Sequence, residues 1–173
     1  AGRSRNRGPE RATGLAAEVL DFRHLHLPGD LRPRRSTYFA KKGYEAVSKQ
    51  MSDTAGAAQE LKQVFQRAVD DDARAFDAVM AAGRLPKASH DDQAKRDAAI
   101  QAATLRAIEI PLAVMRTSAK ALPLIERVAR DGNKNSISDA GVAALCVKTA
   151  ADGAYLNVLI NVPGLSDKKQ SEK

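Results

Sequence analysis

Apolar residues recur at helical spacing along most of the chain, beginning with a segment over residues 37–82. Its apolar positions are Leu61, Phe65, Ala68, Val69, Phe76, Val79 and Met80. Steps of three, four and seven residues place side chains on one face of a helix. Gly83 offers a C-cap and Pro86 follows it, a combination that ends helices. The spacing therefore predicts one long helix that ends near Ala82.

A second helical segment begins at Ser89 and ends at Asp131-Gly132. Asp92 stands three residues after Ser89, the spacing of a capping box. Pro111 and Pro123 lie inside the segment. Each proline removes a backbone donor, so we expect each to kink or break the helix.

A third helical segment begins near Ser136 or Ser138, with Asp139 again three residues after a serine, and runs to about Val162. Pro163-Gly164 closes it. No stretch of the chain alternates apolar and polar residues with a period of two. The predicted fold class is therefore all-α, a bundle of long, proline-kinked helices.

The net charge of +7 is concentrated at the N-terminus. Residues 1–36 hold eight Arg and no Lys against four acidic residues. They could form a basic arm for RNA or another anionic surface; the alternative is a disordered or misassigned leader. Phe22 is their one aromatic residue, too few for stacking on single-stranded bases. We divide the chain into an atypical, disordered leader (1–36), a helical domain (37–165) and a polar tail (166–173), and expect no nucleic-acid partner.

The composition also limits the compartment and the cofactors. Cys146 is the single cysteine, which excludes an intrachain disulfide and fits a reducing compartment. No stretch approaches the roughly 18 uncharged apolar residues of a membrane span, and no secretory signal is present. We expect a cytoplasmic protein without a membrane partner. His24, His26 and His90 lack metal-ligand spacing, so no metal site is predicted.

Asp72 interrupts an apolar stripe. Steps of three and four residues from Phe65 lead through Val69 and Asp72 to Phe76. A carboxylate among apolar residues is costly unless it is paired or functional, and burial should raise its pKa toward neutral pH. Asp72 is therefore either a proton carrier or a structural carboxylate paired with a basic residue of a neighbouring helix.

A second polar line follows the third helix. Asp139 and Asn157 are five helical turns apart and share one face, with Asn161 one turn further, provided the helix passes Gly153 without a break. Asn side chains both donate and accept hydrogen bonds, so they can read the edge of a heterocycle. The alternatives are a favourable charge at a helix N-terminus for Asp139 and interhelical hydrogen bonds for the asparagines.

Two basic residues, Arg84 and Lys87, flank the end of the first helix. Arg and Lys bind carboxylates and phosphates. They could hold an anionic part of a ligand. The alternative is that they complement the negative end of the helix dipole.

Four segments together resemble the formimidoyltetrahydrofolate cyclodeaminase family, which includes methenyltetrahydrofolate cyclohydrolases. They are YFAKKGYE (38–45), DARAFDAVM (72–80) with RLPK (84–87), NSISDAGVA (135–143) and GAYLNVLIN (153–161). The resemblance covers residues 38–165. It implies an all-helical homodimer that binds a folate between helices and uses no cofactor beyond its tetrahydrofolate substrate.

The resemblance implies roles for the polar residues named above. The family closes 5-formiminotetrahydrofolate to 5,10-methenyltetrahydrofolate with release of ammonia, and a shielded carboxylate such as Asp72 or Asp139 would serve the proton transfers. Asn157 and Asn161 would orient the pterin, and Arg84 or Lys87 would meet the anionic glutamate tail of a polyglutamylated folate. The family motif adds two further expected substrate contacts, Asn135 and Ser138.

The chain departs from the family at its start. Family members begin with a Gly-rich turn and an Ala-rich helix that residues 1–36 do not contain. We therefore expect an N-terminally atypical or truncated member. The alternatives to a cyclodeaminase are a methenyltetrahydrofolate cyclohydrolase and a truncated, non-catalytic dimerisation scaffold of the same family.

Overall fold

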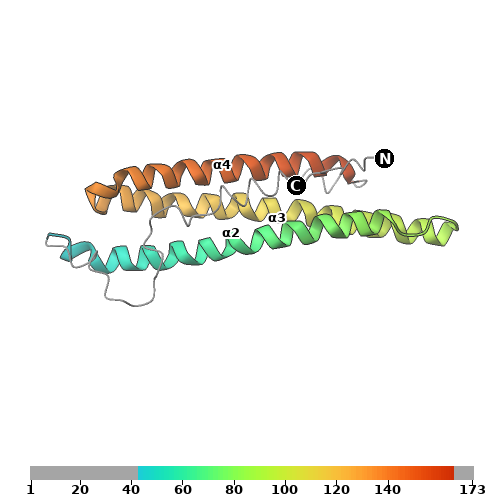
Figure 1. The fold of residues 1–173 in the computed structure, drawn as a ribbon, viewed down its shortest axis with the longest axis horizontal. Coiled ribbons are helices and arrows are strands. Elements are labelled where there is room, and N and C mark those ends of the chain that lie inside the picture. The colour runs from blue at the N-terminus through green and yellow to red at the C-terminus, as the bar shows by residue number, and fades with distance from the viewer. Residues whose placement is uncertain (1–42, 166–173) are drawn as a thin grey trace, which may run out of the picture.

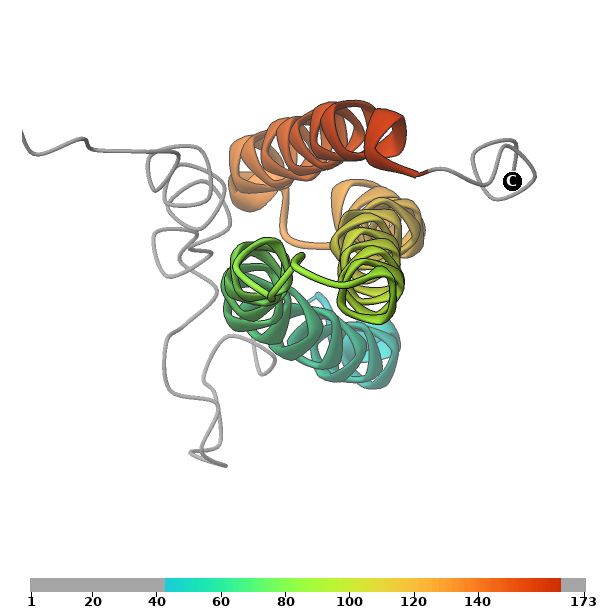
Figure 2. The same ribbon diagram turned by 90° about the vertical axis from the view of Figure 1, so that its right-hand side faces the viewer.

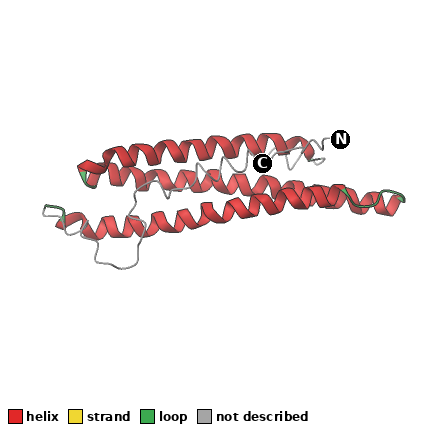
Figure 3. Ribbon diagram, viewed as in Figure 1, coloured by secondary structure: helices red, strands yellow, loops and turns green. Residues whose placement is uncertain are grey.

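The computed structural model describes residues 43–165, which form three long helices joined by short connections (Figures 1 and 3). The elements are η1 (Glu45–Val47), α2 (Ser48–Gly83), α3 (His90–Asp131), η2 (Lys134–Ser136), α4 (Ile137–Asn161) and η3 (Val162–Gly164). This part of the chain holds no strand, which confirms the all-α prediction. The predicted leader (1–36) and tail (166–173) lie outside the described residues, as do His24 and His26.

Helix α2 follows the predicted apolar stripe. Phe65, Ala75 and Ala82 are buried on it. The helix includes Gly83, and the C-cap residue is Arg84, one position later than expected. The helix starts at Ser48, whereas the predicted start was near residue 37. Residues 37–42 lie outside the described part of the chain.

Helix α3 has the predicted capping box. The Ser89 hydroxyl accepts a hydrogen bond from the Asp92 backbone N–H at 3.0 Å, and the Asp92 carboxylate accepts one from the Ser89 N–H at 3.2 Å. The helix continues through both prolines without a break. Pro111 is buried, and packing of α3 against helices on two sides offsets the local cost of the missing backbone donors.

Helix α4 passes Gly153 without interruption, as the predicted polar line requires. Its N-cap is Ser136, whose side chain makes no capping hydrogen bond. The Ser-x-x-Asp spacing therefore does not form a capping box here, in contrast to Ser89. Instead, the single 3-10 turn η2 leads into the helix, with the Asn133 side chain accepting a hydrogen bond from the Asn135 N–H at 3.1 Å.

Helix α3 is central, and α2 and α4 pack against it to similar extents. Viewed along the bundle in Figure 2, α4 and α2 lie on either side of α3. Because α3 runs antiparallel to both, α2 and α4 are parallel to each other. The core consists largely of alanines, with Phe65 as its largest fully buried side chain.

Two described segments, α3 and residues 134–164, are long and apolar enough to cross a membrane by length and composition alone. The lack of long uncharged apolar runs in the sequence had predicted no segment of this kind. In α3 the apolar character is used in packing, because α3 lies between two helices. In α4 much of it is exposed, with Leu145 66%, Leu156 63% and Ile160 76% accessible to solvent.

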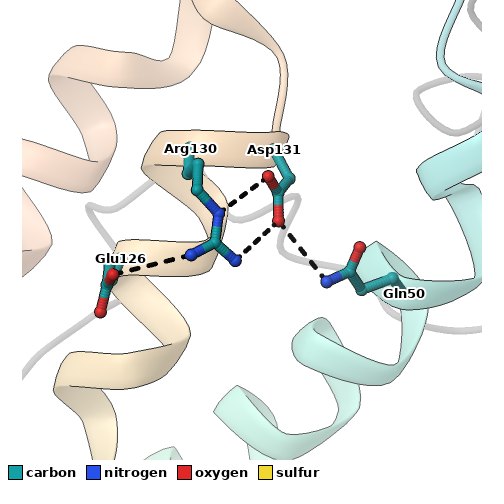
Figure 4. A network of polar contacts seen from close by, with 4 residues as sticks. All are labelled: Gln50, Glu126, Arg130 and Asp131. Atoms are coloured by element: carbon teal, nitrogen blue, oxygen red, sulfur yellow. Dashed lines mark hydrogen bonds and ion pairs between the residues drawn. The ribbon is translucent and has the colours of Figure 1, made fainter.

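A polar network at the end of the bundle opposite the α2–α3 turn ties α3 to α2 (Figure 4). Arg130 donates to the Asp131 carboxylate at 3.0 and 3.1 Å, and Gln50 donates to the same carboxylate at 3.5 Å. The hydrogen bond from Arg130 lowers the pKa of Asp131, and the same pair raises the pKa of Arg130. Nearby, Arg127 reaches the buried Thr54 hydroxyl of α2 at 3.4 Å.

Candidate functional site

Asp72 lies partly buried on α2, within the stripe that the sequence predicted. Ala75, one turn later, is buried against Ala107 and Ile110 of α3. Burial raises the pKa of the Asp72 carboxyl, the direction that the sequence predicted. No ion pair or hydrogen bond to another side chain is recorded for Asp72 within residues 43–165. This environment favours the neutral carboxyl more than a surface site does.

Helices α2 and α4 meet at Phe65 and Ala150. Phe65 of α2 packs against Ala150 of α4 in one core cluster. Asp72 stands seven residues after Phe65, and Asn157 stands seven residues after Ala150. Seven residues are about two helical turns. Asp72 therefore lies on the same face of α2 as Phe65, and Asn157 on the same face of α4 as Ala150, each about 10 Å further along. Because α2 and α4 run in the same direction (Figure 1), we infer that Asp72 and Asn157 lie at similar heights along the bundle. The two helices contact each other much less than either contacts α3.

Asn161 lies one turn after Asn157 on α4. Its side-chain amide donates to the Asn157 backbone carbonyl at 2.8 Å, and both asparagines are partly buried. The hydrogen bond occupies one of the two N–H groups of the Asn161 side chain. It also leaves the Asn157 side chain free of this contact, because only its backbone oxygen is used.

Apolar residues flank Asp72 one turn before and one turn after it along α2. Val69 is partly buried one turn before it, and Phe76, one turn after it, is 44% exposed. Met80 continues this line and is also 44% exposed. Asp72 thus has apolar neighbours along α2, two of which are exposed.

Arg84 and Lys87 lie beyond this level, at the α2–α3 turn. Both are exposed. Arg84 stands twelve residues after Asp72, about 18 Å along the helix. The C-terminal carbonyl of α2 is bound by a residue that sequence reasoning missed: Arg96 of α3 donates to the Gly83 oxygen at 3.2 and 3.3 Å. Arg84 and Lys87 are therefore not needed for that carbonyl.

Asn135, Ser138 and Asp139 lie at the opposite end of α4. Asp139 precedes Asn157 by eighteen residues, about 27 Å along the helix. All three side chains are exposed. Asp139 is exposed in the single chain and lies far from Asn157 along α4, so its catalytic role stays a prediction. The substrate contacts expected of Asn135 and Ser138 stay predictions.

Other surface features do not coincide with these residues. A shallow depression on the outer side of α2 is lined by Gln63, Gln66, Arg67 and Asp70, on a different side of the helix from Asp72. Among residues 43–165, no group of three His, Cys, Asp or Glu side chains could hold a metal ion. Cys146 is a free, partly buried thiol.

Comparison with known proteins shows where the likeness extends. Residues 36–173 match the protein family described as Formiminotransferase-cyclodeaminase. A methenyltetrahydrofolate cyclohydrolase of Methylorubrum extorquens is 39% identical over 133 residues, 77% of this chain and 64% of the relative. A formimidoyltransferase-cyclodeaminase of Sus scrofa is 42% identical over 99 residues, 57% of this chain and 18% of the relative. The chain thus spans less than two thirds of each of these relatives.

A solved structure has the same fold. The formiminotetrahydrofolate cyclodeaminase of Thermotoga maritima superimposes with a TM-score of 0.66 at 27% sequence identity. The superposition covers 94% of this chain and 69% of that chain. The three-helix arrangement is therefore shared with a protein whose structure has been solved.

Proposed function

Because the chain belongs to the formiminotransferase-cyclodeaminase family, we propose that it acts on a tetrahydrofolate at the level of Asp72 and Asn157. The proposal is supported by a partly buried carboxyl with a raised pKa on α2 and by the inferred height of Asn157 on α4, two turns beyond the Phe65–Ala150 contact. The proposed reaction closes 5-formiminotetrahydrofolate to 5,10-methenyltetrahydrofolate and releases ammonia, which makes the chain a lyase.

The reaction needs a proton donor and then a stabilised cation. The folate N10 forms a bond to the formimino carbon, and the bond from that carbon to the formimino nitrogen breaks. Ammonia leaves with the proton from N10 and one further proton. A neutral Asp72 carboxyl supplies that proton. The carboxylate that remains is then next to the positively charged methenyl product and stabilises it.

The remaining residues of this end of the bundle bind rather than react. Asn157 and Asn161 donate to and accept from the polar edge of the pterin, and Phe76 and Met80 offer apolar contact to its faces. Arg84 and Lys87 bind the carboxylates of the glutamate tail. A tail that must reach about 18 Å beyond Asp72 favours a polyglutamylated folate. No cofactor beyond the tetrahydrofolate is part of this proposal, and its compartment is the cytoplasm.

A second candidate reaction is hydrolysis of the methenyl group. The cyclohydrolase relative supports it, since that protein aligns with more of this chain than the pig enzyme does. The same Asp72 carboxylate would then stabilise the methenyl cation and accept a proton from the attacking water. A homodimer is part of the proposal for either reaction.

Purified protein offered the two substrates separately tests the proposal. With 5-formiminotetrahydrofolate, we expect release of ammonia in step with methenyltetrahydrofolate absorbance. An Asp72→Asn variant should lose both signals, because it keeps the size and polarity of the side chain but cannot transfer the proton. An Asp70→Asn variant is the matched control, since Asp70 is exposed on another side of the same helix.

Each result has a definite meaning. Turnover of methenyltetrahydrofolate alone assigns the cyclohydrolase reaction. Absence of both activities in a protein that is helical by circular dichroism overturns the proposal and leaves a non-catalytic scaffold. Equal losses in the Asp70→Asn and Asp72→Asn variants would remove Asp72 from the reaction.

A further inference from the structure

The side of α4 that faces away from the bundle carries apolar side chains toward both ends and a pair of charged residues at its centre. Seven of the twelve exposed large hydrophobic side chains among the described residues belong to α4: Ile137, Val142, Leu145, Tyr155, Leu156, Leu159 and Ile160. At about 100° per residue they cover an arc of about 140°. The four buried residues of α4, Ala140, Val147, Ala150 and Ala154, lie on the opposite side. In Figure 2, α4 forms the edge of the bundle and no described element covers this side.

The centre of this side carries a regular heptad pattern, which we call the α4 seam. Its members are Gly141, Leu145, Lys148, Asp152, Tyr155 and Leu159. All six are exposed, and their spacing of four, three, four, three and four residues is that of the contact positions of a coiled coil. An apolar face of this length on a protein surface indicates an interaction site.

The two charges on the seam are opposite in sign and central. Lys148 forms an ion pair with Asp152 one turn later. The pair lies next to the midpoint of α4, with apolar residues on both sides of it. A partner that presents the same pattern in reverse order places a negative charge opposite Lys148 and a positive charge opposite Asp152, which favours association.

We propose that the α4 seam binds the α4 seam of a second copy of this chain, antiparallel and around a two-fold axis at the level of Ala150. This axis exchanges Lys148 with Asp152 and Leu145 with Tyr155. It also exchanges Gly141 with Leu159, so that a large side chain meets a position without one. Every member of the seam thus finds a complementary member of the same set, as an isologous interface requires.

The charges also fix the direction. Parallel pairing in register would place Lys148 against Lys148 and Asp152 against Asp152, and like charges in direct opposition disfavour association. The antiparallel arrangement joins two pairs of unlike charges and keeps the apolar residues paired. The α4 seam would thus be the contact surface of the homodimer in the proposed function, on which it rests in this respect. Association of two chains is measured separately from folate turnover.

Charge reversal in separate variants tests the interface. Sedimentation equilibrium of the unaltered chain should show a dimer. The variants Lys148→Asp and Asp152→Lys each place like charges together, and each should raise the dimer dissociation constant by roughly tenfold or more. An equimolar mixture of the two variants should associate again. The intrahelical ion pair is lost in both variants, so its loss cannot produce this recovery.

A cysteine crosslink tests the direction. In a Cys146→Ala background, a mixture of Leu145→Cys and Tyr155→Cys proteins should form a crosslinked heterodimer, while each variant alone should not crosslink. Crosslinking of Leu145→Cys with itself would overturn the antiparallel arrangement.

Three other results would overturn the proposal. A chain that is folded and monomeric at all concentrations, or a dimer that both charge reversals leave unchanged, would assign the seam to another polypeptide or to none. Flotation of a monomeric chain with phosphatidylcholine vesicles would assign it to a membrane. Retained association without folate turnover would contradict the proposed function but support the interface.

Discussion

Replacement of Phe65 by alanine tests the contact that aligns α2 with α4. Phe65 is 1% exposed and is packed against Leu61, Val114 and Ala150, one neighbour from each of the three helices. Removal of a fully buried phenylalanine leaves a cavity and costs about 3–5 kcal/mol. A domain of this size has a free energy of unfolding of about 5–15 kcal/mol, so the change removes a large part of it.

The matched control is Phe76→Ala on the same helix. Phe76 is 44% exposed, so Phe76→Ala removes roughly half as much buried apolar area as Phe65→Ala does. It should lower the free energy of unfolding by about 1 kcal/mol. Urea unfolding followed by circular dichroism measures both changes, at concentrations low enough to keep the chain monomeric. Equal costs for the two variants, or a cost below about 1 kcal/mol for Phe65→Ala, would refute the assignment of Phe65 as the central packing residue.

Two further predictions concern charge. Folding raises the pKa of Asp72, so the folded chain holds its proton more tightly than the unfolded chain does. The free energy of unfolding therefore falls as pH rises from the ordinary carboxyl pKa through the raised value, and at neutral pH an Asp72→Asn variant should melt at a higher temperature than the unaltered chain. This difference in melting temperature should disappear at pH values below the ordinary carboxyl pKa. A difference in melting temperature that does not change with pH would contradict a raised pKa for Asp72. Separately, Arg96→Ala should reduce the free energy of unfolding by about 1 kcal/mol through loss of the hydrogen bonds to the Gly83 carbonyl, while Arg84→Ala should change it little, and equal effects in urea unfolding would show that the Arg96 contact is unimportant.

Local sequence patterns predicted the helices and their capping with few errors. The period of apolar residues identified all three long helices, and the Ser89–Asp92 spacing identified a capping box that is present in the structure. The prolines were expected to kink or break the second helix, and the structure shows that they do not break it. Pro111 is buried within the central helix, where contacts with α2 and α4 stabilise the helix despite the missing donor.

The candidate site was predicted residue by residue but not as an arrangement. The sequence singled out Asp72 and Asn157 separately, and their similar height along the bundle is inferred from the contact of Phe65 with Ala150. Asp139 was included because it shares a helical face with Asn157. A shared face does not imply proximity, since about 27 Å of helix separate the two residues.

The interhelical polar contacts were not predictable from spacing. Arg96 and Gly83 are joined across thirteen residues and Arg127 and Thr54 across seventy-three. Such pairs depend on how two helices are placed relative to each other. No local period reports that placement.

The most direct test of the account compares kcat/KM for Asp72→Asn and Asp139→Asn, with 5-formiminotetrahydrofolate and with methenyltetrahydrofolate. Asp72 lies partly buried on α2, whereas Asp139 is exposed near the start of α4. The account predicts a loss of at least about a hundredfold for Asp72→Asn and nearly unchanged turnover for Asp139→Asn. Loss in Asp139→Asn with activity kept in Asp72→Asn would contradict it and move the reaction to the opposite end of the bundle.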